Sequence, residues 1–206
     1  DSHLMQVSVF DLGNVDYSQA WKLQAEIHER VVSGELPSTL LLLEHPHTYT
    51  LGKTADKAHL IAADDFMKEH QIQVFDIDRG GDITYHGPGQ LVGYPILNLT
   101  EWHKDTHKYL RSLEEMMIRL CQHFELEADR KEGLTGVWIG QRKIAAIGVK
   151  VSRWVTMHGF AFNVNTDLSY IDHIVPCGIQ NKQVTSLAQE LGRVVDMSEV
   201  KYRVKK

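Results

Sequence analysis

The spacing of apolar residues changes several times along the chain, and each change predicts a new element of secondary structure. Apolar and polar residues alternate over residues 5–10 as in a strand, whereas Ala20, Leu23, Ile27 and Val31 recur at helical spacing. In chain order, the first half is predicted to form a strand at 5–10, a helix at 17–32, a central strand at 40–43, a short helix at 64–70, a strand at 72–75 and an extended run at 91–99.

Three single residues are expected to mark boundaries in this half. Asp16 is a candidate N-cap for the first helix, and Gly34 is expected to end that helix. Pro95 cannot donate a backbone hydrogen bond. It therefore predicts that part of the run 91–99 lies at an edge or a bend of a sheet.

The second half begins with another amphipathic helix, predicted at 105–124. Strands follow at 136–139, 143–151 and 156–164, with a hairpin turn at Gly140-Gln141, and the chain ends in helices at 186–191 and from 198 onward. Consecutive strands joined by short turns, with helices set apart, favour an α+β fold with a mixed sheet over regular βαβ winding. The apolar face of the long helix consists of Leu110, Leu113, Met117, Leu120, Cys121 and Phe124.

Composition bounds the domain organisation and the function. No repeat or linker divides the chain, so residues 5–206 are predicted to form one domain, and residues 1–4 are typical of an expression remnant rather than a targeting signal. A net charge of −5 over 206 residues does not favour nucleic acid or an anionic membrane. No apolar run approaches the roughly 20 residues of a membrane-spanning helix. Two cysteines do not make a disulfide framework, which fits a reducing cytoplasm.

The densest chemical signal is a glycine-rich stretch at residues 79–90. Four glycines and one proline occupy its twelve positions, so the backbone can adopt positive φ and approach a ligand closely. The glycine spacing matches neither the dinucleotide fingerprint nor the P-loop. A loop restricted in this way predicts a substrate-holding segment. Its sequence is Arg79-Gly80-Gly81-Asp82-Ile83-Thr84-Tyr85-His86-Gly87-Pro88-Gly89-Gln90.

Cys177 is the candidate nucleophile. It lies between a proline and a glycine, outside any periodic pattern, which is typical of a loop residue that a ligand can reach; the alternative is a buried structural thiol. Cys121, on the apolar helix face, is expected to be a small core residue. A thiolate needs a nearby cation or imidazole. Lys143 opens the small, apolar run 144–149 and is the candidate partner, with His86 and His158 as alternatives and an ordinary solvated lysine as the simpler interpretation.

Other chemistries find less support. The chain has 12 histidines, but none lies in a zinc-binding frame. His103 and His107, one helical turn apart, are equally consistent with a solvated face, so no metal is predicted. Serine catalysis lacks a Gly-x-Ser-x-Gly elbow.

Several separated motifs together resemble one family. Residues 79–95, 135–138, 142–148, 158–163, 174–179 and 184–187, in this order, are similar to the lipoyl(octanoyl) transferase family, also called lipoate-protein ligase B. The resemblance spans nearly the whole chain after Met5. It implies the mixed sheet flanked by helices of the biotin- and lipoate-protein ligase catalytic domain.

The resemblance also implies an activity and its partners. The expected reaction, the first step of endogenous protein lipoylation in the cytoplasm, transfers octanoyl from octanoyl-acyl carrier protein to a lysine of a lipoyl domain, without a cofactor. The acceptors are lipoyl domains of 2-oxoacid dehydrogenase complexes and the glycine cleavage H protein. Cys177 is expected to carry the acyl group as a thioester, and Lys143 to lower its pKa and handle protons. The implied substrate contacts are Arg79, Gly80, Gly81, Asp82, Ile83, Thr84, Tyr85, His86, Ala146, Ile147, Gly148, Gly159, Phe160 and Ala161.

Three other functions stay open at this point: an ATP-dependent lipoate or biotin ligase, a non-catalytic acyl- or lipoyl-domain-binding protein, and a cysteine hydrolase. The docking surface for an acidic carrier protein is also open. A local basic patch or scattered surface charges would be equally consistent with Arg79, Arg142, Lys143, Lys150 and Arg153.

Overall fold

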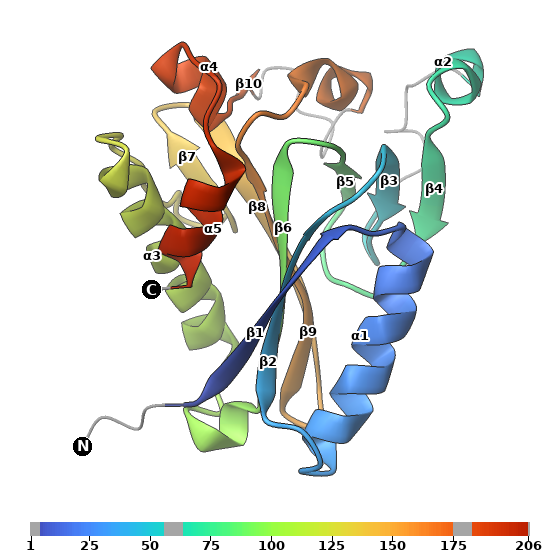
Figure 1. Ribbon diagram of the computed structural model, residues 1–206, viewed down its shortest axis with the longest axis vertical. Helices are drawn as coiled ribbons and strands as arrows, with labels where there is room; N and C mark the ends of the chain where they lie inside the picture. Colours follow the sequence, from blue (N-terminus) through green and yellow to red (C-terminus); the bar gives the residue numbers. More distant parts are fainter. Residues whose placement is uncertain (1–4, 56–63, 175–182, 206) are drawn as a thin grey trace.

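The computed structural model describes residues 5–55, 64–174 and 183–205. Two sheets and seven helical segments make up these residues (Figure 1). The strands are β1 (Val7–Asn14), β2 (Ser38–Glu44), β3 (Thr48–Leu51), β4 (Gln73–Asp76), β5 (Ile83–His86), β6 (Gln90–Ile96), β7 (Val137–Ile139), β8 (Arg142–Ser152), β9 (Val155–Asn163) and β10 (Gln183–Val184). The helices are α1 (Tyr17–Val32), α2 (Asp64–Glu69), α3 (Thr106–His123), α4 (Leu187–Leu191) and α5 (Met197–Val204), with 3₁₀ turns η2 (Leu99–Glu101) and η3 (Leu168–His173).

The larger sheet has seven strands in the order β1-β2-β6-β9-β8-β10, with β7 also paired to β8. β1 runs parallel to β2 and β10 runs parallel to β8, while the other neighbours are antiparallel. The smaller sheet has the order β4-β3-β5. The predicted α+β fold with a mixed sheet flanked by helices is therefore confirmed.

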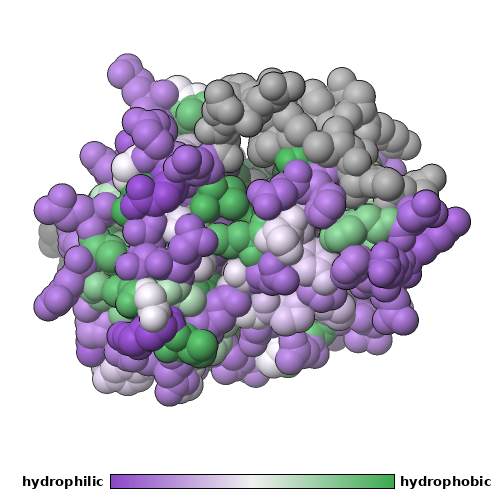
Figure 2. Space-filling model, turned by 90° about the horizontal axis from the view of Figure 1, so that it is seen from above, coloured by the Kyte–Doolittle hydropathy of each residue, from purple (hydrophilic) through white to green (hydrophobic). Residues whose placement is uncertain are grey.

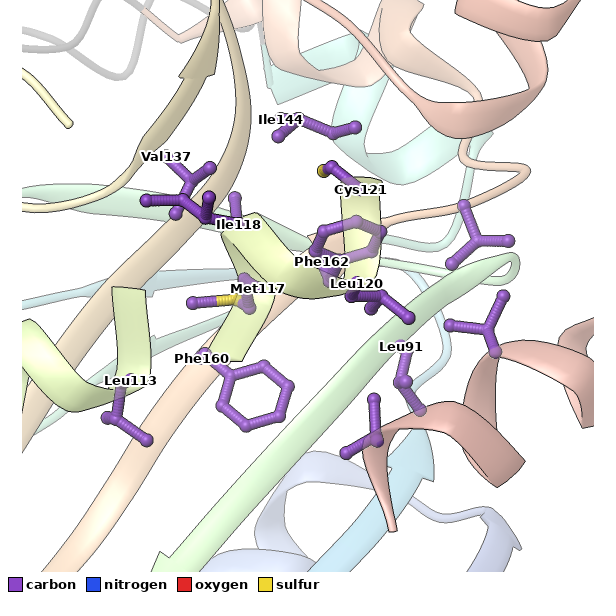
Figure 3. Close-up of a cluster of buried hydrophobic side chains, with 14 of the residues drawn as sticks. Leu91, Leu113, Met117, Ile118, Leu120, Cys121, Val137, Ile144, Phe160 and Phe162 are labelled. Carbon is purple, nitrogen blue, oxygen red and sulfur yellow. The ribbon is translucent and has the colours of Figure 1, made fainter. Parts of the chain in front are cut away.

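Helices cover both faces of the larger sheet (Figure 1). Because successive side chains of a strand point to opposite faces, Leu42 packs toward α3 and α5, whereas Leu41 and Leu43 pack toward α1. Cys121, on the buried face of α3, lies in the core beside Ile144 and Phe162 (Figure 3). Burial raises the pKa of its thiol to about 12, so the expectation of an inert core cysteine is confirmed.

The smaller sheet lies on the same side of the larger sheet as α1 (Figure 1). Its buried side chains, among them Tyr49 and Tyr85, pack with Tyr170 from η3. The rings of Tyr85 and Tyr170 are stacked with their centroids 5.2 Å apart, and Tyr49 donates a hydrogen bond of 2.7 Å to the Tyr170 carbonyl. This cluster holds η3 against the small sheet, so the space between the two sheets has fixed walls.

One boundary prediction is confirmed in position only, and another differs from the structure. Asp16 occupies the N-cap position of α1, but its side chain makes no capping hydrogen bond. In α3, by contrast, the side chain of the N-cap residue Asp105 accepts a hydrogen bond from the Lys108 amide. Pro95 is not on an edge strand, because β6 lies between β2 and β9. The proline is accommodated because the pairing of β6 with β9 ends at Gly93, so its missing donor costs no ladder hydrogen bond on that side.

The α3 side of the core generates a stability prediction. Met117 is 0% exposed, so we expect Met117→Ala to lower the free energy of unfolding by about 2–5 kcal/mol through lost burial and a residual cavity. Arg119→Ala, two residues away on the exposed face of the same helix, is the control and should change it by less than about 1 kcal/mol. Denaturant unfolding of both variants makes the comparison; equal losses would contradict the assignment of the buried face.

Candidate active site

The loop between β4 and β5 carries Arg79, whose side chain is buried. The guanidinium group donates hydrogen bonds to the carbonyl oxygens of Gly80 (2.9 Å), Thr50 (3.0 Å) and Asp82 (2.8 Å), and to Thr50 Oγ1 (2.9 Å). All four acceptors are neutral, and burial lowers the pKa of Arg79. A cation fixed in this way has one orientation and keeps its charge inside the protein.

Close backbone contacts explain several glycines around this loop. Gly81 has a φ of +97°, which favours glycine. A Cβ on Gly52, directly after β3, would lie 2.2 Å from the Gly81 carbonyl oxygen. On β8, a Cβ on Gly148 would lie 2.9 Å from the Gly80 carbonyl oxygen, and Gly80 donates a hydrogen bond of 3.3 Å to the Val149 carbonyl. The loop is therefore seated directly on the larger sheet.

The first cavity lies between this loop and the larger sheet, and we call it the arginine cavity. Its free volume is about 30 Å³, room for about one water molecule and well below the roughly 300–1,000 Å³ of small-molecule sites. It gathers nine of the residues that the resemblance assigns to substrate contact, together with Tyr17, Tyr94 and His158. The nine are Arg79, Thr84, His86, Ala146, Ile147, Gly148, Gly159, Phe160 and Ala161.

The second cavity, which we call the lysine cavity, has a free volume of about 90 Å³. Its walls contain Lys143 and two further predicted contacts, Ile83 and Tyr85. Three residues, Thr84, Ala146 and Ala161, line both cavities. The two cavities are therefore adjacent, with these three small side chains at their junction.

Lys143 lies at the start of β8, where the Thr185 amide donates a hydrogen bond of 2.9 Å to the Lys143 carbonyl. Its ammonium group lies 5.4 Å from the ring centroid of Trp138, a cation–π distance. A Cβ on Gly136 would come within 2.9 Å of Lys143 Cε, so the glycine leaves room for the lysine stem. The lysine is half-buried and is held beside its cavity.

The remaining sequence predictions have different outcomes. Gly80, Gly81 and Asp82 form the loop itself and do not line either cavity. Cys177 lies outside the described residues, so its distance from Lys143 stays untested. Among the described residues, no group of three or more histidine, cysteine or carboxylate side chains could hold a metal.

His86 is a neutral hydrogen-bond donor through one ring nitrogen. Gln90 donates its amide hydrogens to the Tyr85 carbonyl and Asn163 Oδ1, so its Oε1 accepts from His86 Nδ1 at 2.8 Å. Burial, and then the neighbouring His45, lower the pKa of His86 to about 3. The imidazole therefore presents Nε2 as an acceptor at neutral pH.

His158 is held by a carboxylate that sequence reasoning missed. Its Nε2 lies 2.7 Å from Asp78 Oδ1, and Lys150 Nζ donates a hydrogen bond of 2.6 Å to Asp78 Oδ2. Burial of Asp78 alone would raise its pKa, but the hydrogen bonds from Lys150 and His158 lower the pKa to about 2. The only sequence signal for this role was the position of Asp78 directly before Arg79.

A polar network connects the two cavities and was also missed. Asn163 accepts from Gln90 and donates to the Thr185 carbonyl at 3.1 Å, and Thr185 Oγ1 donates to Glu190 at 2.8 Å. Glu190 in turn accepts two hydrogen bonds from Arg142, at 2.6 and 3.0 Å. Because each member has a partner, these buried groups keep one arrangement.

The idea of one basic patch is not supported by these contacts. Arg79 is buried, Arg142 is paired with Glu190, and Lys150 is paired with Asp78. Arg153 is likewise paired with Glu29. Most of the predicted positive charge is therefore neutralised locally.

Comparison with known proteins gives consistent matches over almost the whole chain. The family described as the lipoyl protein ligase A/B catalytic domain matches residues 16–206. A protein named octanoyltransferase from Flavobacterium johnsoniae is 50% identical, with 97% of this chain and 93% of that protein covered. An octanoyltransferase from Rubrobacter xylanophilus is 51% identical, with 93% and 87% covered.

Solved structures share the fold at lower identity. A lipoate-protein ligase A bound with ATP superposes with a TM-score of 0.78 at 16% identity, covering 97% of this chain and 83% of that chain. A biotin protein ligase from Aquifex aeolicus gives a TM-score of 0.55 at 15% identity, covering 97% and 66%. At these identities the likeness concerns the fold alone.

The Asp78 cluster predicts a dependence of stability on pH. The pKa of Asp78 is about 2 in the folded protein against 3.8 ordinarily, so its ionised form favours folding above pH 3.8 and this stabilisation is lost as the pH falls toward 2. A side chain 35% exposed is screened by solvent, so we expect a contribution of about 1 kcal/mol. Urea unfolding at several pH values from 5 to 2 measures the free energy of unfolding. In Asp78→Asn, this free energy should fall less with decreasing pH than in the wild type. Parallel pH curves for variant and wild type would contradict the assignment.

Proposed function

Because the chain belongs to the lipoyl protein ligase A/B catalytic domain family, and its relatives at about 50% identity are octanoyltransferases, we propose that it is an acyltransferase that moves an octanoyl group onto a lysine of a lipoyl domain. The donor is octanoyl-acyl carrier protein. The observation that carries the proposal is the lysine cavity: a half-buried lysine lines it, and it adjoins a second cavity that gathers nine of the expected substrate contacts.

The proposed reaction has two acyl transfers. The Cys177 thiolate attacks the carbonyl carbon of the donor thioester, a new C–S bond forms, and the carrier thiol leaves with a proton from Lys143. The acceptor lysine amine then attacks the Cys177 thioester, an amide bond forms, and its proton passes to Lys143 while the thiolate is released. The first step exchanges one thioester for another, so it needs no ATP.

Burial of methylene groups favours the binding of a medium-length acyl chain. A hydrocarbon chain gains about 0.8 kcal/mol for each buried methylene, so seven carbons beyond the carbonyl provide ample binding energy. Ala146 and Ala161 are cross-strand partners in the β8–β9 ladder, and Gly148 and Gly159 are the next pair on that face. These small side chains leave the strand surface free for an acyl chain.

The partners follow from this chemistry. The acceptors are lipoyl domains of 2-oxoacid dehydrogenase complexes and the glycine cleavage H protein, and the reaction belongs to the cytoplasm. A broad basic patch made of the five candidate cations does not support carrier docking, because four of them are buried or paired. The upper face in Figure 2 instead shows small apolar patches among polar residues. No described helix is long and apolar enough to cross a membrane.

The acyl-enzyme gives a direct test. Wild-type protein mixed with octanoyl-acyl carrier protein should gain one octanoyl group by intact mass, and hydroxylamine should remove it. Cys177→Ala should gain none, and Cys121→Ala is the matched control because that thiol is buried in the core. Adduct formation that persists in Cys177→Ala would contradict the thioester step.

Lys143 has a separate test. We expect Lys143→Met to slow octanoyl transfer to a lipoyl domain by at least about 100-fold, because general acid–base groups contribute roughly 10²–10⁴-fold. Single-turnover rates with carrier and acceptor measure the effect. An unchanged rate would remove Lys143 from the mechanism.

The same assay separates the alternative functions. ATP-dependent transfer of free octanoate would indicate a ligase, and release of free octanoate without acceptor modification would indicate a hydrolase.

A further inference from the structure

Trp138 lies beside Lys143 in the larger sheet and ends the motif at residues 135–138. The two residues are paired across β7 and β8, and the Lys143 ammonium group lies 5.4 Å from the centroid of the Trp138 ring. Trp138 is 3% exposed, so its ring is shielded from water. A cation is attracted more strongly to a desolvated indole ring than to an exposed one. The contact therefore stabilises the charged form of the Lys143 amine over the neutral form.

The segment that carries Trp138 is fixed on its other edge as well. The Trp138 amide and carbonyl form hydrogen bonds of 2.9 and 2.8 Å with the backbone of Asp129. Two residues earlier, the Gly136 amide donates a hydrogen bond of 3.0 Å to the buried Glu114 carboxylate. Gly136 also lies against the Lys143 stem, since a Cβ there would be 2.9 Å from Lys143 Cε. The ring and the lysine stem therefore keep one relative position.

A second cation contacts the same ring. Lys131 Nζ lies 5.5 Å from the Trp138 ring centroid and donates a hydrogen bond to Gln141 Oε1. Its positive charge opposes protonation of Lys143. Burial raises the pKa of Tyr85, which lines the lysine cavity. The charged and titratable groups on the neighbouring elements are Lys131, Asp129, Glu114 with Arg111 and Arg130, the Arg142–Glu190 pair, and Tyr85.

We propose that Trp138 is a positioning residue for acyl transfer: its ring holds the Lys143 ammonium group beside the lysine cavity and keeps the amine protonated to higher pH. This inference rests on the proposed function of Lys143. In the first transfer Lys143 gives its proton to the leaving carrier thiol, so this step needs the charged amine. The ring extends the pH range over which the charged amine persists.

The pH dependence of acyl-enzyme formation tests the proposal. Single-turnover rates of octanoyl uptake from octanoyl-acyl carrier protein, followed by intact mass, should fall at alkaline pH as Lys143 loses its proton. Trp138→Leu removes the ring, so the midpoint of this alkaline limb should move down by about half a pH unit to one unit. Trp138→Phe keeps an aromatic face and should recover most of the shift. A purely structural role would lower the rates and leave the midpoint unchanged.

Two further proteins supply the control and a measurement that does not depend on how the variants fold. Lys131→Met removes the other cation from the ring, so the midpoint should not fall. In wild-type protein labelled with 5-fluorotryptophan, the ring keeps its shape but loses electron density from its face, so the midpoint should fall. Labelled Trp138→Phe carries fluorine only at Trp21, Trp102 and Trp154 and should match its unlabelled form.

The outcomes separate this inference from the proposed function. A midpoint shared by the wild type, Trp138→Leu and the fluorinated protein overturns the role of Trp138. An alkaline limb that is absent from the wild type, or that persists in Lys143→Met, also overturns it, and octanoyl transfer stands in each case. If the wild type forms no acyl-enzyme, the proposed function itself is overturned.

Discussion

The close approach of the Arg79 loop to strands β8 and β9 is the constraint on which the rest of the site depends. A Cβ at Gly148 would meet the Gly80 carbonyl oxygen at 2.9 Å, so only glycine there leaves the loop its place. The Gly80 amide donates to the Val149 carbonyl, and the Asp78 carboxylate binds Lys150 and His158 from the two strands. Backbone contact and charge pairing thus hold the smaller sheet against the larger one. We call this contact region the seam, and the two cavities lie along it.

Polar groups inside the seam are tolerated because nearly all of them have partners. The Arg79 guanidinium is bound by four neutral oxygens, and the network that contains Gln90, Asn163 and Glu190 continues from one cavity to the other. In a low-dielectric interior such networks favour a single arrangement and make an unpaired group costly. Among the described residues, His158 Nδ1 is one of the buried side-chain atoms without a hydrogen-bond partner, and His158 is one of the residues that line the arginine cavity.

A lipoate-protein ligase A bound with ATP shares this architecture at 16% sequence identity. The architecture therefore does not decide between adenylate and thioester chemistry. In the proposed function the distinction rests on side chains: Lys143, which lines the lysine cavity, and a cysteine at position 177. The cross-strand pair Ala146–Ala161 shapes the space, and a larger residue at either position would narrow the junction between the cavities.

The sequence by itself determined the long helices, the mixed sheet, the buried Cys121 and the glycine-rich loop, because these depend on local periodicity and on residue type. It also grouped most of the cavity wall through its motifs. It did not predict the pairing of Asp78 with His158, which are 80 positions apart, or the contribution of Tyr17 and Tyr94 to the arginine cavity. Nor did it predict that Pro95 lies in an interior strand or that most of the candidate cations are neutralised. Only the tertiary structure decided these points, because strand order and register determine which distant side chains meet, and local patterns carry no record of either.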